Sequence, residues 1–287
     1  MPPASRIEDL SGSDVVRAAD DNFVTHATWG LQTLPGATVH ADEGLTLADS
    51  GLPCDAFNVV CRARLTVEAA VERARKTVAY FASAGRAFSW WVGPADTPAD
   101  LPELLRRAGL SEAGSERLLA LDLEVDLDLQ SSGKPPAIPD FEIRPVASRA
   151  DLRNYALVTA SAAGRDPNIA RFYELAAASL LRSDSPRRLF AGYVGGVPVA
   201  TAEWTAARGA AGLYNVATEP AHRRKGIGSA LTIHALRAAR AEGETLAILQ
   251  AAPAAERLYA RLGFRPIGTI LEFKPKNGLP GPTREAL

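Results

Sequence analysis

The sequence predicts an α/β protein, built on a mixed, partly parallel β-sheet with flanking helices. Apolar segments with strand-like and helix-like periodicity alternate along most of the 287 residues. A strand-like segment at residues 213–218 leads through a basic, glycine-containing turn into an amphipathic helix, and a fully apolar strand follows at residues 246–249. Strand, helix and strand in this order indicate a parallel pair joined by a right-handed crossover. A similar order of elements also recurs in both halves of the chain.

Length and composition limit the class of protein. A chain of 287 residues, with 47% hydrophobic and 23% charged residues, is long enough for two domains with cores of their own. A net charge of −1 argues against a dedicated nucleic-acid binder. No apolar run reaches the roughly 18 residues of a membrane helix, and the first residues lack the pattern of a signal peptide. Cys54 and Cys61 fit no zinc or redox motif. We therefore expect a cytoplasmic protein with no metal site, no nucleic-acid partner and no membrane partner.

A proline-rich segment divides the chain. Residues 130–140 read QSSGKPPAIPD, and their prolines hold the backbone extended and interrupt any helix or central strand. We predict one domain at residues 1–130, a linker at 131–140 and a second domain at 141–273. The remaining residues, 274–287, have the composition of a loop or a disordered tail.

The N-terminal half is predicted to contain three helices and three strands. Gly85 and Gly109 follow two of the helices, where a left-handed residue commonly ends a helix. In order, the predicted elements are a helix at 15–31, a strand at 56–65, a helix at 67–84, a strand at 87–92, a helix at 101–108 and a strand at 118–125.

The C-terminal half is predicted to contain the parallel crossover. Gly195 and Gly196 indicate a tight hairpin turn, and Gly243 and Gly263 end helices. In order, the predicted elements are a strand at 141–146, helices at 150–163 and 169–181, a hairpin of strands 188–194 and 197–204, a strand at 213–218, a helix from 227 to 242, a strand at 246–249, a helix at 254–262 and a strand at 264–273.

The two halves look like an internal duplication. Residues 87–110 and 246–264 each read as a strand, a proline-containing loop, a short helix, a glycine and an apolar residue. The N-terminal copy passes from its strand into its helix through Thr66 alone. It therefore lacks the glycine turn that the C-terminal copy carries.

That glycine turn has the composition of a phosphate-binding loop. Backbone N–H groups at a helix N-terminus point toward a bound anion, and the helix dipole favours negative charge there. Gly226 and Gly228 allow the backbone to approach a ligand closely. Arg223, Arg224 and Lys225 add attraction for a polyanion. The alternative interpretation is a basic loop that only caps a surface helix.

Two motifs resemble those of the GNAT N-acetyltransferase superfamily. Arg223, Gly226 and Gly228 occupy the fixed positions of its pyrophosphate-binding motif, Gln/Arg-x-x-Gly-x-Gly/Ala. Residues 258–264, LYARLGF, resemble its Leu-Tyr-x-x-x-Gly-Phe signature at the expected distance. The resemblance covers residues 141–273 by motif and the N-terminal half only by layout. The chain therefore resembles a tandem GNAT protein with a degenerate N-terminal copy.

The resemblance implies an acyltransferase that moves an acetyl or other short acyl group from acetyl-CoA, or another acyl-CoA, to an amine of a small molecule or peptide. The pyrophosphate would lie on the backbone of residues 224–229. The pantetheine arm would pair with residues 216–218, where strand 213–218 splays from strand 246–249. The implied donor-binding residues are Val216, Ala217, Thr218, Arg223, Arg224, Lys225, Gly226, Ile227, Gly228 and Ser229.

Catalytic candidates are fewer. Tyr259 matches the position at which the family often has a proton donor for the departing thiolate, and packing is its alternative role. Glu203 is a candidate general base, although a solvated strand carboxylate is the simpler interpretation. Asn215 is a candidate for orienting a water molecule or the substrate. His222 borders the loop, and His234 falls among core positions of its helix.

Two other functions remain open at this stage. The donor could be an acyl group on the phosphopantetheine of an acyl carrier protein, or the chain could be a non-catalytic protein that senses CoA. Three consecutive basic residues favour free acyl-CoA, since a carrier presents a single phosphodiester. The sequence leaves open the acceptor, and whether the chain is a monomer or a homodimer.

Overall fold

The structure is a computed structural model that describes residues 12–124 and 138–276. It confirms the α/β class and the tandem arrangement, with the described strands merged into one 11-stranded sheet. The N-terminal elements are α1 Ser13–Trp29, η1 Gly30–Thr33, β1 Thr38–Ala41, β2 Thr46–Asp49, β3 Val59–Cys61, α2 Val67–Ser83, β4 Ser89–Val92, α3 Leu101–Arg107 and β5 Leu110–Asp122. The C-terminal elements are β6 Phe141–Pro145, α4 Arg149–Ala162, α5 Pro167–Leu175, α6 Ala177–Leu180, β7 Arg187–Val194, β8 Val197–Ala207, β9 Ala210–Thr218, η2 Pro220–His222, α7 Ile227–Ala241, β10 Leu246–Ala251, α8 Glu256–Arg261 and β11 Arg265–Pro275.

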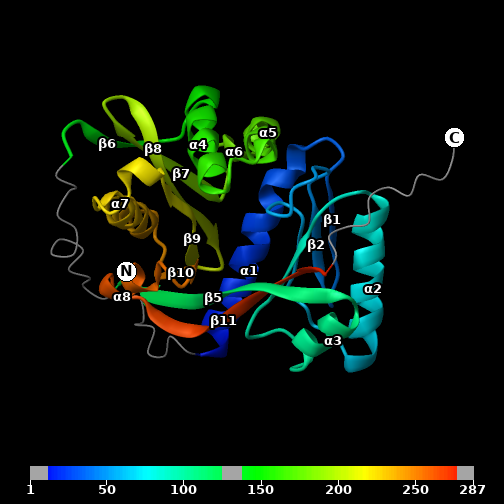
Figure 1. The fold of residues 1–287 in the computed structure, drawn as a ribbon. Coiled ribbons are helices and arrows are strands. Elements are labelled where there is room, and N and C mark those ends of the chain that lie inside the picture. The colour runs from blue at the N-terminus through cyan, green and yellow to red at the C-terminus, as the bar shows by residue number, and fades with distance from the viewer. Residues whose placement is uncertain (1–11, 125–137, 277–287) are drawn as a thin grey trace, which may run out of the picture.

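The two halves exchange their last strands. The sheet order is β1-β2-β3-β4-β11-β5-β10-β9-β8-β7-β6, so β5 of the N-terminal half lies between β10 and β11. In the same way, β11 of the C-terminal half lies between β4 and β5. The two exchanged strands run antiparallel to each other across the middle of the molecule (Figure 1). The centre of the sheet is therefore built by both halves.

Each half contains one parallel pair with a helical crossover. Val59 of β3 pairs with Ser89 of β4, and α2 connects these strands. Ala210 of β9 pairs with Leu246 of β10, and α7 connects them. The order β3-α2-β4-α3-β5 thus repeats as β9-α7-β10-α8-β11, as the sequence predicted.

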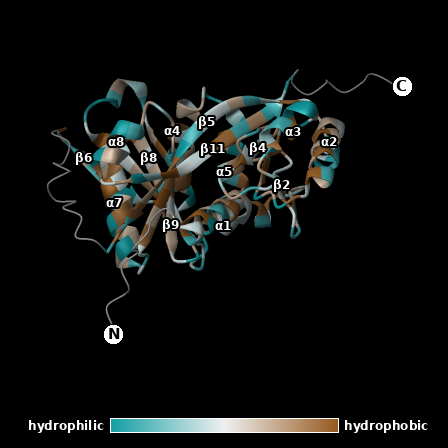
Figure 2. Cartoon of the chain, turned by 90° about the horizontal axis from the view of Figure 1, so that it is seen from below, coloured by the Kyte–Doolittle hydropathy of each residue, from teal (hydrophilic) through white to brown (hydrophobic). Residues whose placement is uncertain are grey.

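Helix α1 lies between the two halves rather than beside one of them (Figure 1). Its residues Val15 and Ala19 pack with Leu118 of β5, Ala210 of β9 and Ile248 of β10 in one buried cluster. Hydrophobic and hydrophilic residues alternate along the surface of α2 (Figure 2). The N-terminal half therefore packs against strands of the C-terminal half and forms one sheet with them.

Several predicted boundaries differ from the structure. Only Val59–Cys61 of the predicted strand 56–65 is extended, because Arg62 has φ +54°. The predicted helix 169–181 is divided into α5 and α6 at Ala176. β5 begins at Leu110 rather than at residue 118, because its residues 110–120 pair with β11. β11 continues to Pro275, into the predicted tail.

The first two strands, the linker, the tail and the cysteines bear on the remaining expectations. β1 and β2 were not predicted. Residues 131–137 of the predicted linker and residues 277–287 of the predicted tail lie outside the described residues, as do residues 125–130 at the end of the predicted N-terminal domain. Cys54 and Cys61 are buried free thiols. Within residues 12–124 and 138–276, no helix is long and apolar enough to cross a membrane, and no cluster of His, Cys, Asp and Glu side chains could hold a metal ion.

Candidate active site

Strands β9 and β10 separate near the middle of the sheet. They are paired only from Ala210 and Leu246 to Leu213 and Leu249, although β9 continues to Thr218. A β-bulge accompanies the separation: the register against β8 changes from Thr201–Ala217 to Glu203–Tyr214, which leaves one extra residue on β9. Bulges bend a strand and increase its local twist. The separation lies where the sequence predicted that the strands would splay.

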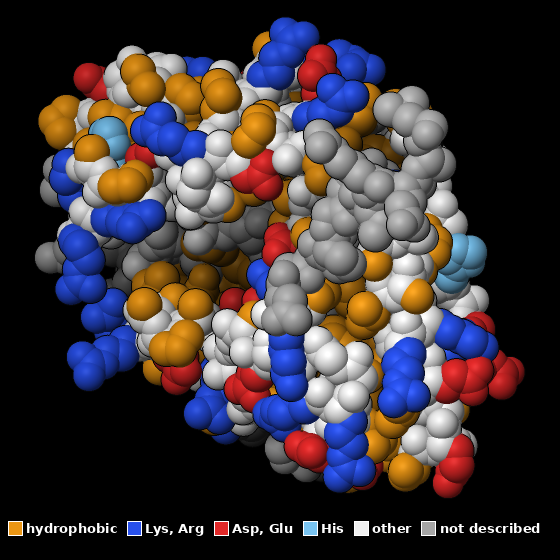
Figure 3. All heavy atoms as spheres, turned by 45° about the vertical axis from the view of Figure 1, so that its right-hand side comes forward, with side chains coloured by type: hydrophobic (Ala, Val, Ile, Leu, Met, Phe, Trp, Pro, Cys, Tyr) orange, Lys and Arg blue, Asp and Glu red, His pale blue; other side chains and the backbone are white. Residues whose placement is uncertain are grey.

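A cavity of about 560 Å³ adjoins this separation. Asn215, Val216 and Ala217 of β9 line one side of it, and Tyr259 of α8 lines another. The N-terminal half contributes α1, β4 and β5, while the exchanged strand β11 contributes charged side chains. One face of the molecule is hollowed, with hydrophobic side chains inside the hollow (Figure 3). The cavity is thus a joint product of both halves and of the strand exchange.

The glycine turn leaves a set of backbone donors unused. Gly226 has φ +85° at the N-cap of α7, where no side chain makes a capping hydrogen bond. Among the described residues, no acceptor takes the backbone N–H groups of residues 224–229. The side chains of Arg223, Arg224 and Lys225 are exposed. This arrangement is a helix N-terminus open to an anion.

Gly228 has space that the protein itself does not fill. A Cβ atom built at this position would meet only Thr218 Oγ1, at 3.9 Å. Packing within the protein therefore does not require glycine there, whereas a ligand lying close to the backbone would. The corresponding helix of the N-terminal half, α2, is closed by its own residue, because Thr66 Oγ1 accepts the N–H of Ala69 at 3.3 Å. Only the C-terminal turn has the form of a phosphate cradle within the part of the chain that the structure describes.

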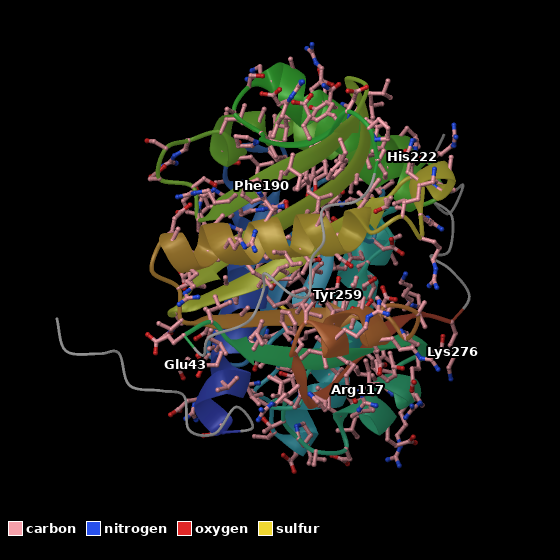
Figure 4. All side chains as sticks on the ribbon, turned by 90° about the vertical axis from the view of Figure 1, so that its left-hand side faces the viewer. Glu43, Arg117, Phe190, His222, Tyr259 and Lys276 are labelled. Atoms are coloured by element: carbon pink, nitrogen blue, oxygen red, sulfur yellow. The ribbon has the colours of Figure 1, made fainter. Side chains whose placement is uncertain are left out.

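Tyr259 lies at the cavity and is only 6% exposed. Its ring packs edge to face on Phe264, with the ring centroids 5.8 Å apart. Burial, with a smaller contribution from the carboxylate of Glu116, raises the pKa of Tyr259 to about 12. Tyr259 belongs to α8, and Figure 4 shows His222 well away from it. The phenol therefore stays protonated at neutral pH.

Glu203 is not the solvated carboxylate that the sequence suggested. It is fully buried, and a short ion pair and two hydrogen bonds offset the cost of burying its charge. Arg187 Nη2 lies 2.6 Å from Oε1, Tyr155 Oη donates to Oε2 at 3.0 Å, and Asn215 Nδ2 donates to Oε1 at 3.0 Å. Buried carboxylates survive in proteins when they are paired and hydrogen-bonded in this way. Glu203 also does not line the cavity.

Asn215 lies at the bulge itself, with φ +50°. Its Nδ2 donates to Tyr173 Oη at 3.1 Å as well as to Glu203, and its carbonyl oxygen accepts the hydroxyl of Thr201 at 2.9 Å. These bonds fix a backbone conformation that residues other than glycine adopt rarely. Glu203 and Asn215 therefore hold the shape of β9 where it turns away from β10.

Residues 151–264 match the model of the acetyltransferase (GNAT) family. This part of the chain belongs to the GNAT family. The solved structure of a GCN5-related N-acetyltransferase from Kribbella flavida is 26% identical, covers 89% of this chain and 96% of its own, and superposes with a TM-score of 0.65. A tandem GNAT protein from the clavulanic acid biosynthesis pathway is 15% identical, with coverage of 90% and 96% and a TM-score of 0.55, which is a likeness of fold. No curated protein matches the chain.

In this GNAT fold, the N-terminal half adds cavity residues that motif reading missed. His26 of α1 stacks on Tyr214 with ring centroids 3.6 Å apart, and its Nδ1 lies 3.3 Å from Glu203 Oε1. Burial and the nearby Arg187 hold the pKa of His26 well below its ordinary value. No motif marks this residue, because the contact of α1 with strands β8 and β9 has no signature in the sequence.

A group of charged residues was missed for a similar reason. Glu116 of β5, Glu272 and Lys274 of β11, and Asp55 before β3 line the side of the cavity that the exchanged strands build. As linear sequence they are ordinary strand and loop charges. Neither His222 nor His234 lines the cavity, and the ring of His234 packs edge to face on Phe190 with the ring centroids 4.8 Å apart.

Proposed function

We propose that the chain is an N-acyltransferase that takes an acetyl or other short acyl group from acyl-CoA and transfers it to an amine. The observation that carries the proposal is that three features follow one another around β9. They are the open helix N-terminus at residues 224–229 after the strand, the splayed edge at residues 216–218, and the cavity that Tyr259 lines. A pyrophosphate, an extended amide chain and a reactive thioester follow one another in the same order along acyl-CoA.

Each feature suits the part of the donor that we assign to it. The unused N–H groups and the exposed Arg223, Arg224 and Lys225 match a diphosphate in charge and in hydrogen-bonding capacity. Pantetheine carries two amides, and the edge of a strand hydrogen-bonds an amide chain as it would another strand. The space above Gly228 leaves room for the ligand to lie against the helix.

Tyr259 suits a role in stabilising the departing sulfur. In the reaction, a C–N bond forms between the amine and the acyl carbon while the C–S bond breaks. A phenol with a pKa of about 12 remains protonated beside a thiolate whose conjugate acid has a pKa near 8.5. Complete transfer of the proton from the phenol to the thiolate is unfavourable, because the two pKa values differ by about 3.5, which corresponds to about 5 kcal/mol. We therefore assign Tyr259 the donation of a hydrogen bond to the leaving sulfur, which is then protonated from solvent.

Glu203 and Asn215 are positioning residues in this proposal. The ion pair with Arg187 stabilises the charged carboxylate, and Glu203 lies outside the cavity lining. Both facts argue against Glu203 as the general base. The hydrogen bonds of Glu203 and Asn215 instead maintain the bulge that separates β9 from β10. Without the bulge, β9 would pair with β10 and close the entry for the pantetheine arm.

A thiol-release screen tests the function directly. Several acyl-CoAs are incubated with the protein and a panel of small amines and peptides, and free thiol is measured against time. Amine-dependent release with formation of the amide supports the proposal. Tight CoA binding without turnover of any donor and acceptor favours the non-catalytic, CoA-sensing alternative. Turnover only with a carrier-bound acyl group identifies the carrier protein as the donor partner.

A further inference from the structure

Glu116 has an unusual setting for a strand carboxylate. It lies directly across from Ile270 in the β5–β11 pairing, and Glu272 lies across from Gly114 two residues further along. Residues directly opposite in an antiparallel pair share a face of the sheet, as do residues two apart. Glu116 and Glu272 therefore lie side by side on the face that lines the cavity. Each comes from a different half of the chain.

The carboxylates in the cavity are only partly neutralised. Lys274 Nζ lies 2.9 Å from Asp55 Oδ2 and 3.1 Å from Glu272 Oε1, so a single ammonium serves two carboxylates. Glu272 Oε1 also accepts the hydroxyl of Ser89 at 2.7 Å. Within the described part of the chain, Glu116 has neither an ion pair nor a hydrogen bond of its own. This wall of the cavity therefore carries excess negative charge, and Glu116 is the member without a partner.

Burial, followed by the repulsion of Glu272, raises the pKa of Glu116 above its usual range. The other titratable side chains that line the cavity with it are Glu272 and Lys274 of β11, Tyr259 of α8, His26 of α1, Asp55 and Arg187. Glu116 also acts on Tyr259, since its charge contributes to the raised pKa of that phenol. The two side chains are therefore within electrostatic reach of each other.

The cavity lining also contains a group of aromatic side chains. Phe57 and Phe172 stack face to face, with ring centroids 3.6 Å apart, and Phe23 meets Trp91 edge to face at 6.0 Å. All four rings line the cavity. Aromatic walls favour an apolar body, and they also tolerate a cation over a ring face. A carboxylate without a partner at the end of such a cavity calls for a positively charged group.

We propose, resting on the acyltransferase function proposed above, that Glu116 is the general base for the acceptor and that the acceptor is a cationic primary amine with an apolar or aromatic body. The ammonium of such a substrate is held between Glu116 and Glu272, with its apolar body against the aromatic wall. The N-terminal half, which lacks a phosphate cradle, thus supplies the acceptor end of the active site.

The protons of this reaction balance. An ammonium R–NH₃⁺ cannot attack until it loses one proton, which passes to the carboxylate of Glu116 and from there to solvent. The amine nitrogen then bonds to the acyl carbon and the C–S bond breaks. A second proton leaves the nitrogen and an equivalent proton is taken up by the sulfur, while the third stays on the amide. The net products are the amide, free thiol and one proton.

Other bases fit this role less well. Glu203 is saturated by Arg187, Tyr155 and Asn215. His26 lines the cavity, but its strongly lowered pKa makes it a poor acceptor of a proton. Asp55 and Glu272 share Lys274. Glu116 is therefore the cavity carboxylate that remains available.

The primary test compares Glu116→Gln with Glu112→Gln. Glu112 lies on the same strand but is exposed and paired with Arg106 at 2.7 Å, outside the cavity. With acetyl-CoA and 2-phenylethylamine as probes, we expect E116Q to lower kcat/KM for the amine about 10²-fold or more at pH 7. CoA affinity should remain within about twofold, and E112Q should behave as wild type. E116Q with wild-type kcat/KM for the amine overturns the proposal.

The pH profile supplies a second readout. In the wild type, activity rises with pH as Glu116 loses its proton, and the raised pKa places this limb above the usual range of a glutamate. In E116Q this limb should move to the higher pH at which the free amine itself deprotonates. Glu116→Asp keeps a carboxylate and should retain the limb at reduced kcat, which carries the test if E116Q does not fold. An unchanged profile in E116Q contradicts the assignment, and so does a wild-type kcat in E116D.

A binding experiment separates this inference from the proposed function. Calorimetry with the CoA-saturated wild-type protein compares 2-phenylethylamine with 2-phenylethanol, which has the same body without the charge. We expect the amine to bind at least tenfold more tightly, and E116Q to remove most of that difference. This result holds even if no turnover is found, in which case only the acyltransferase function fails. Equal affinity for the alcohol and the amine overturns the charge selection while leaving the acyltransferase function open.

Discussion

Arg187 Nη2 lies 2.6 Å from Glu203 Oε1, and both side chains are buried where β7 meets β8. Such a pair contributes little net stability when compared with an apolar pair, but removal of one partner leaves an uncompensated buried charge. Here Glu203 also accepts hydrogen bonds from Tyr155 Oη and Asn215 Nδ2. The pair therefore connects the stability of the sheet with the conformation of the bulge on β9.

We expect Glu203→Gln to lower the free energy of unfolding by about 3–5 kcal/mol, because it leaves the charge of Arg187 buried without a counter-ion. Urea denaturation of the purified variant measures this loss. The matched control is Glu142→Gln, which removes an exposed carboxylate paired with Arg144 and should cost no more than about 1 kcal/mol. If E203Q is as stable as the control, the ion pair is not a structural requirement.

The phosphate cradle makes a prediction about Gly228. Gly228→Ala should fold normally, since its Cβ would approach only Thr218 Oγ1 at 3.9 Å, yet it should weaken CoA binding by occupying the ligand's space. Gly228→Glu adds bulk and like charge and should weaken binding at least about tenfold, or 1.4 kcal/mol. Calorimetry measures both. Ala241→Glu adds the same charge at the exposed far end of α7 and should bind CoA normally. Unchanged affinity in a folded G228E variant would remove the cradle from the proposal.

Tyr259 should affect turnover rather than binding. Tyr259→Phe keeps the ring and its contact with Phe264 but removes the hydroxyl to which we assign a hydrogen bond to the leaving sulfur. We expect kcat to fall by roughly 10²-fold with little change in donor affinity. Tyr193→Phe removes a buried hydroxyl outside the cavity, bonded to Asn154 at 3.3 Å, and should keep wild-type kcat. A wild-type kcat in Y259F would reduce Tyr259 to a packing role.

Local signals in the sequence predicted the C-terminal elements well. The Gly195-Gly196 turn, the glycine after α7 and the turn before Ile227 each have a short-range cause, and each lies where the sequence placed it, with Gly195 at φ +56° and Gly243 at φ +96°. The splay of β9 from β10 was predicted from the family resemblance. The bulge at Asn215 that accompanies it was not, because a bulge depends on the register between two strands.

The remainder depends on contacts between distant segments. The exchange of β5 and β11 has no local signature, because either strand could complete its own half with the same alternation of residues. The exchange brings Glu116 beside the splay and turns Glu272 toward the cavity. The burial of Glu203 likewise requires its ion pair with Arg187, which lies sixteen residues earlier in the chain and pairs with Thr205, two residues from Glu203 on β8. Motif reading therefore predicts donor-binding residues, whereas the charged cavity residues of the exchanged strands become visible only in the fold.

One donor should bind per chain. α2 begins at Thr66, whose side chain already accepts the N–H of Ala69, and no glycine turn precedes it. α7 begins at Gly226 with its first N–H groups unused. Calorimetric titration with CoA should give a stoichiometry near one. Thr66→Gly opens the cap of α2 without adding basic residues, and it should not create a second site. Two sites of similar affinity in the wild-type chain would contradict the difference between the two helix N-termini.

The last prediction concerns the identity of the donor. Acyl-CoA and an acylated carrier protein share the pantetheine arm, but only CoA carries a diphosphate and an adenosine 3′-phosphate. Arg223, Arg224 and Lys225 are exposed beside the open N-terminus of α7, more positive charge than a single phosphodiester needs. An acidic carrier would also be attracted to this surface, so the charge of the donor has to be tested together with its size.

We expect kcat/KM to be highest for acetyl-CoA, lower for acetyl-pantetheine and not raised by a carrier protein. Arg224→Gln should reduce kcat/KM for acetyl-CoA several-fold and leave acetyl-pantetheine unaffected, because the smaller donor has no phosphate for Arg224 to meet. Arg240→Gln, an exposed change at the other end of α7, serves as the control and should alter neither. Equal losses for both small donors in R224Q would mean that Arg224 does not contact phosphate. A carrier-bound acyl group preferred by orders of magnitude, with acetyl-CoA inert, would make the carrier protein the physiological donor, since the cradle would then meet one phosphate and an acidic protein surface.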